Sequence, residues 1–391
     1  MTETTHAPPR VAYSELIRLF LRLSITAFGG PLAHIAVAED EIVTRRKWLT
    51  REHYLDLVSA TNLIPGPNST EVMIHVGYVM RGIPGAIVTG VCFIAPAMLL
   101  TLALAMLYVS SGTIPQVQSM LWGIAPVIIA IIAQVGWRLA QTALKNRVLW
   151  VLFIVAALVL FATPTPEVLV MLGAGLIYAL YRVGIPAQAG TLALVALPTL
   201  VQAAQNAPAT LWDLFWYFLK IGSVLFGSGY VLITYIQQDI VNGFGWLSAQ
   251  QLLDAVAIGQ TTPGPVLTTV TVVGYIVAGL PGALLATLGV FLPSFVLVIL
   301  TAPLIPRMRR SRFLGAFLTG VNAGVIAAIG VTLLDLINAG LRNLDGSAWS
   351  PLAILLALGA LVLLLRFRLN ATWLIAAGGL IGVLAGAFGV A

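Results

Sequence analysis

The motif Pro65-Gly66-Pro67 occurs again as Pro263-Gly264-Pro265, and both copies lie inside long apolar stretches. Proline removes a backbone hydrogen-bond donor and glycine permits a sharp turn, so each motif predicts the end of one helix and the start of another. A helix that starts inside an apolar region presents free N–H groups and the positive end of its dipole, which together bind anions. The chemistry that this pattern favours is therefore recognition of a small anion.

Polar side chains lie beside each motif at positions that can cap a helix and donate to an oxyanion. They are Asn68, Ser69 and Thr70 after the first motif, Thr268 and Thr269 after the second, and Gln260 before the second. The alternative is a pair of structural kinks whose hydroxyls serve only as caps. Because the kinks recur in a duplicated pattern, we expect these six residues to contribute to an anion site.

Two cations lie inside apolar segments, Arg22 and Lys220, each six residues before a Phe-Gly pair. A charged side chain at the centre of a membrane costs at least about 2.5–3.5 kcal/mol, so it usually faces a cavity or a partner. Two such cations could flank a dianion and offset part of its lost hydration. Either could instead lie near a helix end and extend to the lipid headgroups.

Further candidates are glycines and carboxylates. Four glycines would break the first helix of each half or allow its close packing: Gly29, Gly30, Gly227 and Gly229. Three carboxylates are candidates for binding a coupling ion or proton: Asp56, Asp254 and Glu71. Stabilisation of a helix start is the default role of the two aspartates. Glu41 and Asp239 occupy equivalent positions in the two halves, near the membrane edge, where a structural or gating role is expected.

The elements that must position these residues are membrane helices. Of 391 residues, 59% are hydrophobic and 9% are charged, whereas a soluble globular domain is about 25% charged. A helix needs about 20 apolar residues to cross the hydrocarbon core. Apolar runs occur at 14–38, 54–80, 83–108, 118–141, 148–163 and 166–181, and again at 212–236, 252–278, 281–304, 313–341, 351–365 and 371–390. The sequence predicts an all-α, multi-pass integral membrane protein.

The two sets of runs correspond because the sequence repeats. A shift of 198 residues aligns Phe28-Gly29 with Phe226-Gly227 and the two Pro-Gly-Pro motifs with each other. After a gap of one residue, a shift of 197 aligns Gly77-Tyr78 with Gly274-Tyr275. We expect a first repeat at 13–182 and a second at 212–391. Between them lies a linker at 183–211, whose weakly apolar stretch 188–206 could be an additional membrane segment.

Equivalent loops differ in positive charge. The loop after the first run contains Arg45, Arg46, Lys47 and Arg51, whereas its counterpart at 243–249 contains no Lys or Arg; residues 307–312 include four arginines and their counterpart none. Lys and Arg prefer the cytoplasmic side, so the repeats are predicted to be inverted. The runs 54–80 and 252–278 would then enter and leave on one side, broken at Pro-Gly-Pro. The alternative is one kinked helix in each half, and the side of the N-terminus stays open.

Several chemistries have no support in the sequence. Cys92 is the single cysteine and the four histidines lack metal-ligand spacing, so no metal site or other cofactor is expected. No G-x-x-x-x-G-K-[ST], Ser/His/Asp or HExxH arrangement occurs, which argues against ATP hydrolysis and other enzyme activity. Basic residues cluster in short loops, as membrane orientation requires, and do not indicate nucleic-acid binding.

The motifs Phe28-Gly29-Gly30-Pro31, Trp48-Leu49 and Pro65-Gly66-Pro67, with their second copies, resemble those of the long-chain type of the chromate ion transporter (CHR) family. The resemblance extends from about Tyr13 to the C-terminus. It implies a bacterial inner-membrane protein that exports chromate, driven by the proton motive force or by anion exchange, with sulfate as a competitor or counter-substrate. The second copy has Ser228 and Gly229 where the first has Gly30 and Pro31, so the halves need not contribute equally.

The combined prediction is an inverted-repeat transporter that moves a tetrahedral oxyanion by alternating access. Its site would lie between the two Pro-Gly-Pro breaks, flanked by Arg22 and Lys220. The residue patterns alone lead to an anion-preferring transporter, and chromate comes from the resemblance. An anion channel and a non-transporting membrane scaffold remain alternatives. The expected partners are the oxyanion, the lipid bilayer and, for assembly, a second copy in a homodimer.

Overall fold

The computed structural model describes residues 11–27, 30–111, 114–183, 209–226, 229–305, 311–344, 348–367 and 369–389, with residues 308 and 346. Across these residues the chain forms helices joined by turns and loops, and the β-structure found there is one isolated bridge between Arg342 and Trp349. Four helical stretches are long and apolar enough to cross a membrane: 68–111, 115–143, 266–304 and 312–340. The protein is a multi-pass membrane protein, as the sequence predicts.

The helices follow the same order in both halves. The first half contains α1 (Tyr13–Thr26), α2 (Gly30–Glu39), η1 (Asp40–Arg45), α3 (Arg51–Thr61), α4 (Asn68–Ser111), α5 (Pro115–Ala143), α6 (Arg147–Ala162) and α7 (Glu167–Val183). The second contains α9 (Leu211–Val224), α10 (Val231–Tyr235), η2 (Ile236–Gly243), α11 (Ala249–Thr261), η3 (Val266–Thr268), α12 (Thr269–Thr301), η4 (Ala302–Leu304), α14 (Arg312–Gly340), α15 (Pro351–Val362), η5 (Leu363–Phe367) and α16 (Ala371–Ala387).

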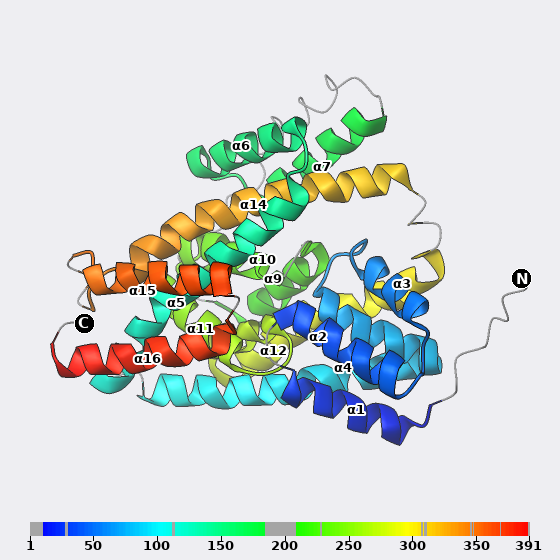
Figure 1. Cartoon of the computed structure of the whole chain (residues 1–391), viewed down its shortest axis with the longest axis horizontal. Coiled ribbons are helices and arrows are strands. Elements are labelled where there is room, and N and C mark those ends of the chain that lie inside the picture. The colour runs from blue at the N-terminus through cyan, green and yellow to red at the C-terminus, as the bar shows by residue number, and fades with distance from the viewer. Residues whose placement is uncertain are drawn as a thin grey trace, which may run out of the picture.

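Helices of the two halves pack against each other rather than forming separate bodies. Figure 1 shows α14 of the second half beside α6 and α7 of the first, and α16 beside α5. Glycines allow close approach at these contacts: Gly123 of α5 meets the backbone of Gly378 and Gly382, and Gly320 of α14 meets that of Ala174. Gly123 and Gly320 are equivalent in the repeat, so the same packing occurs twice.

Side-chain caps fix many helix starts. Seven of the described residues accept a hydrogen bond from a backbone N–H two or three residues later: Thr50, Asn146, Thr210, Ser248, Ser311, Ser350 and Asn370. Asn146 and Ser350 begin the equivalent helices α6 and α15. These two residues are 204 apart, whereas the repeat shift before them is 197, because the loop before α15 is longer than the loop before α6. With the shift of 204, the start of α16 corresponds to the start of α7.

The runs predicted at 14–38 and 212–236 are each two helices instead of one. α1 ends at Thr26 and α2 begins at Gly30, whose φ of +79° favours glycine. In the second half, α9 ends at Val224 and α10 begins at Val231. Two glycines expected at these breaks, Gly29 and Gly227, lie outside the described residues, as do the stretch 188–206 and most of the linker.

α4 and α12 are each a helical hairpin. The backbone turns sharply at Arg81–Gly82 in α4 and at Ala278–Gly279 in α12. The Thr89 hydroxyl donates to the carbonyl of Met73, sixteen residues earlier, at 2.9 Å. A straight helix rises 1.5 Å per residue and would hold these groups far apart. The turns fall where the sequence separates the runs 54–80 and 83–108, and 252–278 and 281–304.

Candidate functional site

The two Pro-Gly-Pro motifs occupy short non-helical segments, one between α3 and α4 and the other between α11 and η3. The Gly66 N–H donates to the carbonyl of Leu225 at 2.7 Å, and the Gly264 N–H donates to the carbonyl of Ala27 at 3.2 Å. Ala27 and Leu225 are equivalent residues that follow α1 and α9. Each motif is therefore bonded to the helix break of the opposite half.

Neither central glycine leaves room for a side chain. Gly66 and Gly264 have φ values of +147° and +93°, which L-residues rarely adopt. A Cβ at Gly66 would meet the Glu71 carboxyl group and Ser294, and one at Gly264 would meet Ala97. Ala97 of α4 and Ser294 of α12 are again equivalent residues. Each lies in the half opposite to the glycine that it contacts. Each Pro-Gly-Pro loop therefore packs against the long hairpin of the opposite half.

A cavity of about 690 Å³ lies beside the two motifs. Its floor includes three pairs of repeat-equivalent residues: Pro31 and Gly229, Asn62 and Gln260, and Pro67 and Pro265. It also includes the two residues that follow the second proline of each motif: Asn68 and Ser69 in the first half, and Val266 and Leu267 in the second. Its walls come from α2, from α5 and from the junction of η5 with α16. Because each pair takes one residue from each half, the floor lies where the repeats meet.

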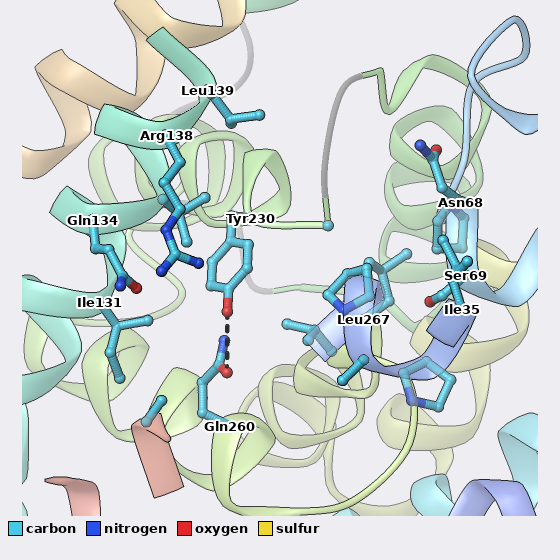
Figure 2. A pocket seen from close by; sticks show the side chains of 18 of the residues that line it. Ile35, Asn68, Ser69, Ile131, Gln134, Arg138, Leu139, Tyr230, Gln260 and Leu267 are labelled. Atoms are coloured by element: carbon cyan, nitrogen blue, oxygen red, sulfur yellow. Dashed lines mark hydrogen bonds between the residues drawn. The ribbon is translucent and has the colours of Figure 1, made fainter. Parts of the chain in front are cut away.

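Figure 2 shows Arg138 of α5 beside Tyr230 and Gln260 in this cavity. The Tyr230 hydroxyl donates to Gln260 Oε1 at 3.3 Å. With Oε1 held in that bond, the buried Nε2 of Gln260 has no hydrogen-bond partner among the described residues. Within the described part of the chain, the Arg138 guanidinium forms no ion pair. A cation and an uncommitted amide donor thus lie in one cavity.

The remaining polar groups of the cavity are neutral. Asn68 Nδ2 donates to Asn62 Oδ1 at 2.6 Å, and the buried Ser69 lies beside them. Gln134, on the wall formed by α5, donates to the carbonyl of Leu364 at 2.9 Å. No Asp or Glu is among the described residues that line the cavity. One cation with several neutral dipoles favours an anion over a cation.

A family model described as "Chromate transporter" matches residues 14–179 and 212–383. The chain belongs to the chromate transporter family. The chromate transport protein of Cupriavidus metallidurans is 33% identical, covering 98% of this chain and 95% of its own. That of Pseudomonas aeruginosa is 32% identical, covering 97% and 94%. The probable chromate transport protein of Synechococcus elongatus is 30% identical, covering 87% and 88%. No solved structure matches the chain.

Family membership confirms the resemblance seen in the sequence. The chromate transporter family is a family of transport proteins and is not known for enzymes, in agreement with the expectation from the motifs. The family supports a role in chromate transport for this membrane protein. The two matched stretches also place one copy of the family's sequence in each half of the chain.

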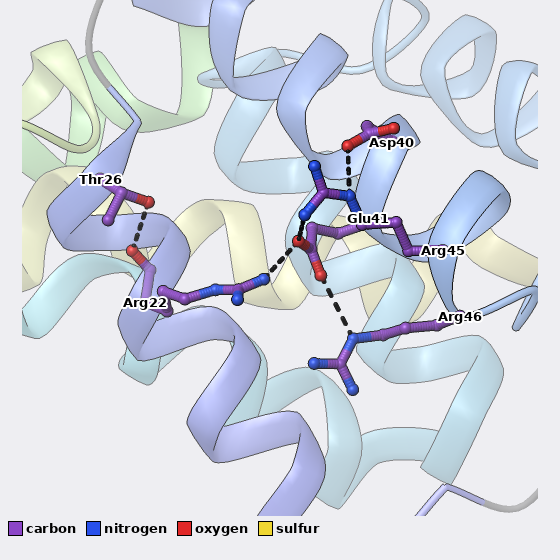
Figure 3. A network of polar contacts seen from close by, with 6 residues as sticks. All are labelled: Arg22, Thr26, Asp40, Glu41, Arg45 and Arg46. Atoms are coloured by element: carbon purple, nitrogen blue, oxygen red, sulfur yellow. Dashed lines mark hydrogen bonds and ion pairs between the residues drawn. The ribbon is translucent and has the colours of Figure 1, made fainter.

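In this chromate transporter family member, Arg22 and Lys220 lie away from the cavity. Arg22 forms an ion pair with the buried Glu41, which also pairs with Arg45 at 3.2 Å and with Arg46 at 3.4 Å (Figure 3). Lys220 Nζ lies 3.4 Å from Asp239 Oδ2. The sequence places these cations at the substrate, whereas the structure gives each a carboxylate partner. Among the described residues, the cation that lines the cavity is Arg138.

Three predicted hydroxyl donors also lie outside the cavity lining. Thr268 donates to the carbonyl of Pro265 and accepts from Thr101, and Thr269 donates to the carbonyl of Val266. Both hydroxyls therefore serve the helix start, as the structural alternative proposes. The Thr70 hydroxyl is buried and has no hydrogen-bond partner in the described part of the chain, but it does not line the cavity. Asn68, Ser69 and Gln260 are the predicted polar residues that the structure brings to the cavity.

The predicted coupling carboxylates do not line the cavity either. Asp254 accepts from Tyr108 at 2.9 Å and from Gln250 at 3.1 Å, which indicates a structural role. Asp56 lies on α3, outside the lining. Glu71 is completely buried beside Gly66, and neither of its carboxyl oxygens has a hydrogen-bond partner among the residues that the structure describes. Of the three carboxylates, Glu71 is therefore the one for which the described hydrogen bonds indicate no structural role.

Arg138 and Tyr230 are two of the cavity residues that were not among the sequence predictions. Arg138 lies near the end of the apolar run 118–141, where a cation ordinarily marks the cytoplasmic end of a membrane helix. One signal could have singled it out: the repeat places Asp335 at the equivalent position, so the charge is reversed between the halves. Tyr230 replaces Leu32 of the first half, and it supplies the hydroxyl that orients Gln260.

Proposed function

We propose that this protein is a secondary active transporter that exports chromate across the bacterial inner membrane by alternating access. The observation that carries the proposal is the cavity at the meeting point of the two halves. Its floor is built from equivalent residues of both repeats, and Arg138 and Gln260 offer donors to an anion there. A carrier needs a site that both of its halves can enclose in turn, and such a site lies at the repeat interface.

The inverted arrangement of the repeats, at 13–182 and 212–391, is supported by two features. Gly66 bonds to Leu225 while Gly264 bonds to Ala27, which is the exchange expected of two halves related by a two-fold axis. The positive loops of one half also correspond to uncharged loops of the other. Inverted repeats give a transporter two conformations that are related by exchanging the roles of the halves.

The Pro-Gly-Pro segments act in this proposal as re-entrant turns. A Cβ at Gly259, near the end of α11, would overlap the side chain of Thr269, at the start of α12. These residues are ten apart, so the chain folds back on itself at the motif. This contact favours a re-entrant segment over one long kinked helix. Backbone groups freed by such a turn are tolerated in a membrane where they line a cavity.

The substrate is a tetrahedral dianion. Arg138 supplies charge and fork-shaped donors, and Gln260 Nε2, Asn62 and Ser69 supply neutral donors. Sulfate has the same shape and charge, so it competes for the same donors. The cavity contains no lining carboxylate that would repel either anion.

Export is favoured by the side on which the cavity opens. Arg138 lies near the end of α5 that leads to Lys145 and Arg147, which the distribution of positive charge places in the cytoplasm. An interior-negative potential contributes roughly 2.3 kcal/mol per charge per 100 mV, or about twice that for a dianion leaving the cell. The membrane potential can therefore drive export, and Glu71 is the candidate for any coupled proton.

The test is uptake of radiolabelled chromate into everted membrane vesicles, with and without an uncoupler. We expect saturable uptake that the uncoupler abolishes, that excess sulfate inhibits and that Arg138→Gln reduces strongly. Arg182→Gln is the matched control, because Arg182 is an exposed cation at the end of α7 and does not line the cavity. Flux that never saturates would indicate a channel, and no flux from well-inserted protein would exclude chromate transport.

A further inference from the structure

The cavity is one of two equivalent regions, and the second is closed. In the open region, Val135, Arg138 and Leu139 of α5 line the cavity and are partly or fully exposed. Their equivalents on α14 are Thr332, Asp335 and Leu336. Thr332 and Leu336 are completely buried, and Asp335 is only half-buried where Arg138 is exposed. The same helix face therefore lines a cavity on α5 and is buried by packing on α14.

The helix that packs over α14 is α7, and its equivalent in the other half, α16, begins at the wall of the open cavity that faces α5. Ala371, at the start of α16, lines that cavity, and its equivalent at the start of α7 is Glu167. α7 packs along α14, as Figure 1 shows. Glu167 is buried, and the carboxylates of Asp239 and Asp335 act on it electrostatically. The closed region therefore gathers Glu167, Asp335 and Asp239, the last of them paired with Lys220, where the open region has Arg138.

Two buried polar atoms in the closed region have no hydrogen-bond partner within the part of the chain that the structure describes. They are Thr332 Oγ1 and Glu167 Oε2, and the residues that bear them are at most 4% exposed. Buried polar groups are nearly always hydrogen-bonded, so each exception requires an explanation. Water supplies the missing partners if this region opens in another conformation. The equivalents of these two residues, Val135 and Ala371, already line the open cavity.

We propose that Thr332, Asp335 and Glu167 line a second vestibule, closed in this conformation, that opens to the opposite side of the membrane. The inference rests on the proposed alternating access and names the residues of the other state. A dianion on the cavity floor meets Arg138 on the loading side and Asp335 on the other. Opposite charge favours binding on the first side, and like charge favours release on the second. The acidic vestibule is therefore the exit.

The test uses two single-cysteine variants at equivalent positions, Val135→Cys and Thr332→Cys, in a Cys92→Ala background. Right-side-out and everted vesicles are treated with the membrane-impermeant reagent 2-(trimethylammonium)ethyl methanethiosulfonate, with and without chromate. We expect Val135→Cys to react from the cytoplasmic face and Thr332→Cys from the outer face, the latter faster during chromate turnover. Ala323→Cys, buried on the same helix as Thr332, is the control and should not react.

Reaction of Thr332→Cys from the cytoplasmic face would overturn the proposal. So would its lack of reaction in both vesicle types while the same protein transports chromate. The labelling does not require chromate to be the substrate: opposite-face reaction without chromate flux would sustain the vestibule and refute the proposed substrate. A second variant tests the charge. Asp335→Asn should lower severalfold the concentration at which sulfate added outside inhibits export, and an unchanged value would refute the electrostatic role.

Discussion

Arg22, Lys220 and Arg138 are all cations in or beside apolar segments, but their neighbours give them different roles. Arg22 and Lys220 each have a carboxylate partner on the helical turn that follows the second helix of their half. Arg138 has no ion pair within the described residues and lies in a cavity with amide donors. A cation already neutralised by a carboxylate attracts an anion weakly, so the unpaired one is the better site.

Replacing Arg138 should weaken chromate binding more than any later step. A hydrogen bond to a charged group contributes about 1.5–3 kcal/mol, and 1.4 kcal/mol corresponds to a factor of about ten in affinity. Arg138→Gln should therefore raise the KM for chromate at least about tenfold, and Arg138→Lys should recover part of the loss. Initial uptake rates over a range of chromate concentrations measure this. An equal effect of Arg182→Gln would contradict the assignment.

The ion pairs of Arg22 and Lys220 should matter for stability, and unequally. Glu41 is buried and contacts Arg22, Arg45 and Arg46, so Glu41→Gln leaves three cations without their common carboxylate. Asp239 has one cation partner, and both side chains are partly exposed. Glu41→Gln should lower the midpoint of thermal unfolding of the detergent-solubilised protein clearly more than Asp239→Asn does. Equal midpoints would show that the shared carboxylate adds nothing.

At the scale of elements, the two Pro-Gly-Pro loops and the hairpin turns of α4 and α12 use glycine for different reasons. Gly66 and Gly264 need both an unusual φ and the absence of a Cβ, because neighbouring side chains and backbone from the other half occupy that space. Gly82 and Gly279 have positive φ, but nothing lies within 4 Å of a Cβ placed there. The loops are therefore constrained by packing and the turns by backbone conformation alone.

This difference predicts how alanine substitutions will rank. Gly82→Ala should cost roughly 1–3 kcal/mol, because a φ of +64° with a ψ of −152° is a backbone region that only glycine adopts readily, and should leave chromate uptake measurable. Gly66→Ala adds a collision with Glu71 and Ser294 and should abolish uptake. Thermal unfolding of both proteins, together with vesicle uptake, checks the ranking. The opposite order would mean that the loop adapts to a side chain more readily than the turn does.

The floor of the site could be predicted from the sequence because Gly and Pro act locally. Pro-Gly-Pro interrupts a helix wherever it occurs, and its duplication identified the two segments that meet at the cavity. The role of Arg138 could not be predicted in this way, because it depends on which cations have a carboxylate nearby in three dimensions. Glu41 lies 19 residues from Arg22, and no local pattern joins them. The hydroxyls of Thr268 and Thr269 were ambiguous for the same reason.

At the scale of the whole molecule, the distribution of charge differs between two halves that share one fold. Arg138 lies on the open side and Asp335 at the equivalent place on the closed side. The halves are thus equivalent in backbone and opposite in charge at one position. This charge asymmetry alters the binding affinity and the transport rate on each side, but it supplies no free energy for net transport. Without a driving gradient, such a transporter moves its substrate equally in both directions. In the proposed mechanism the net direction of transport comes from the membrane potential.

Reversing the potential should therefore reverse transport. In proteoliposomes with a potassium diffusion potential set by valinomycin, chromate should accumulate on the positive side, whichever side that is. The expected dependence is that of an anion carrying two charges, about 4.6 kcal/mol per 100 mV. Accumulation against chromate's own gradient distinguishes this from a leak. Accumulation that ignores the potential but follows an opposing sulfate gradient would indicate obligatory anion exchange.

The exchanged hydrogen bonds at Gly66 and Gly264 have a consequence for how such a chain can be divided. Each loop takes its acceptor from the other half, so a half that is made alone has an incomplete loop and no floor for the site. A cut between residues 183 and 209 should leave two polypeptides that are inactive separately and active when produced together. The gene for this protein could therefore be split into two without loss, but neither piece could be discarded.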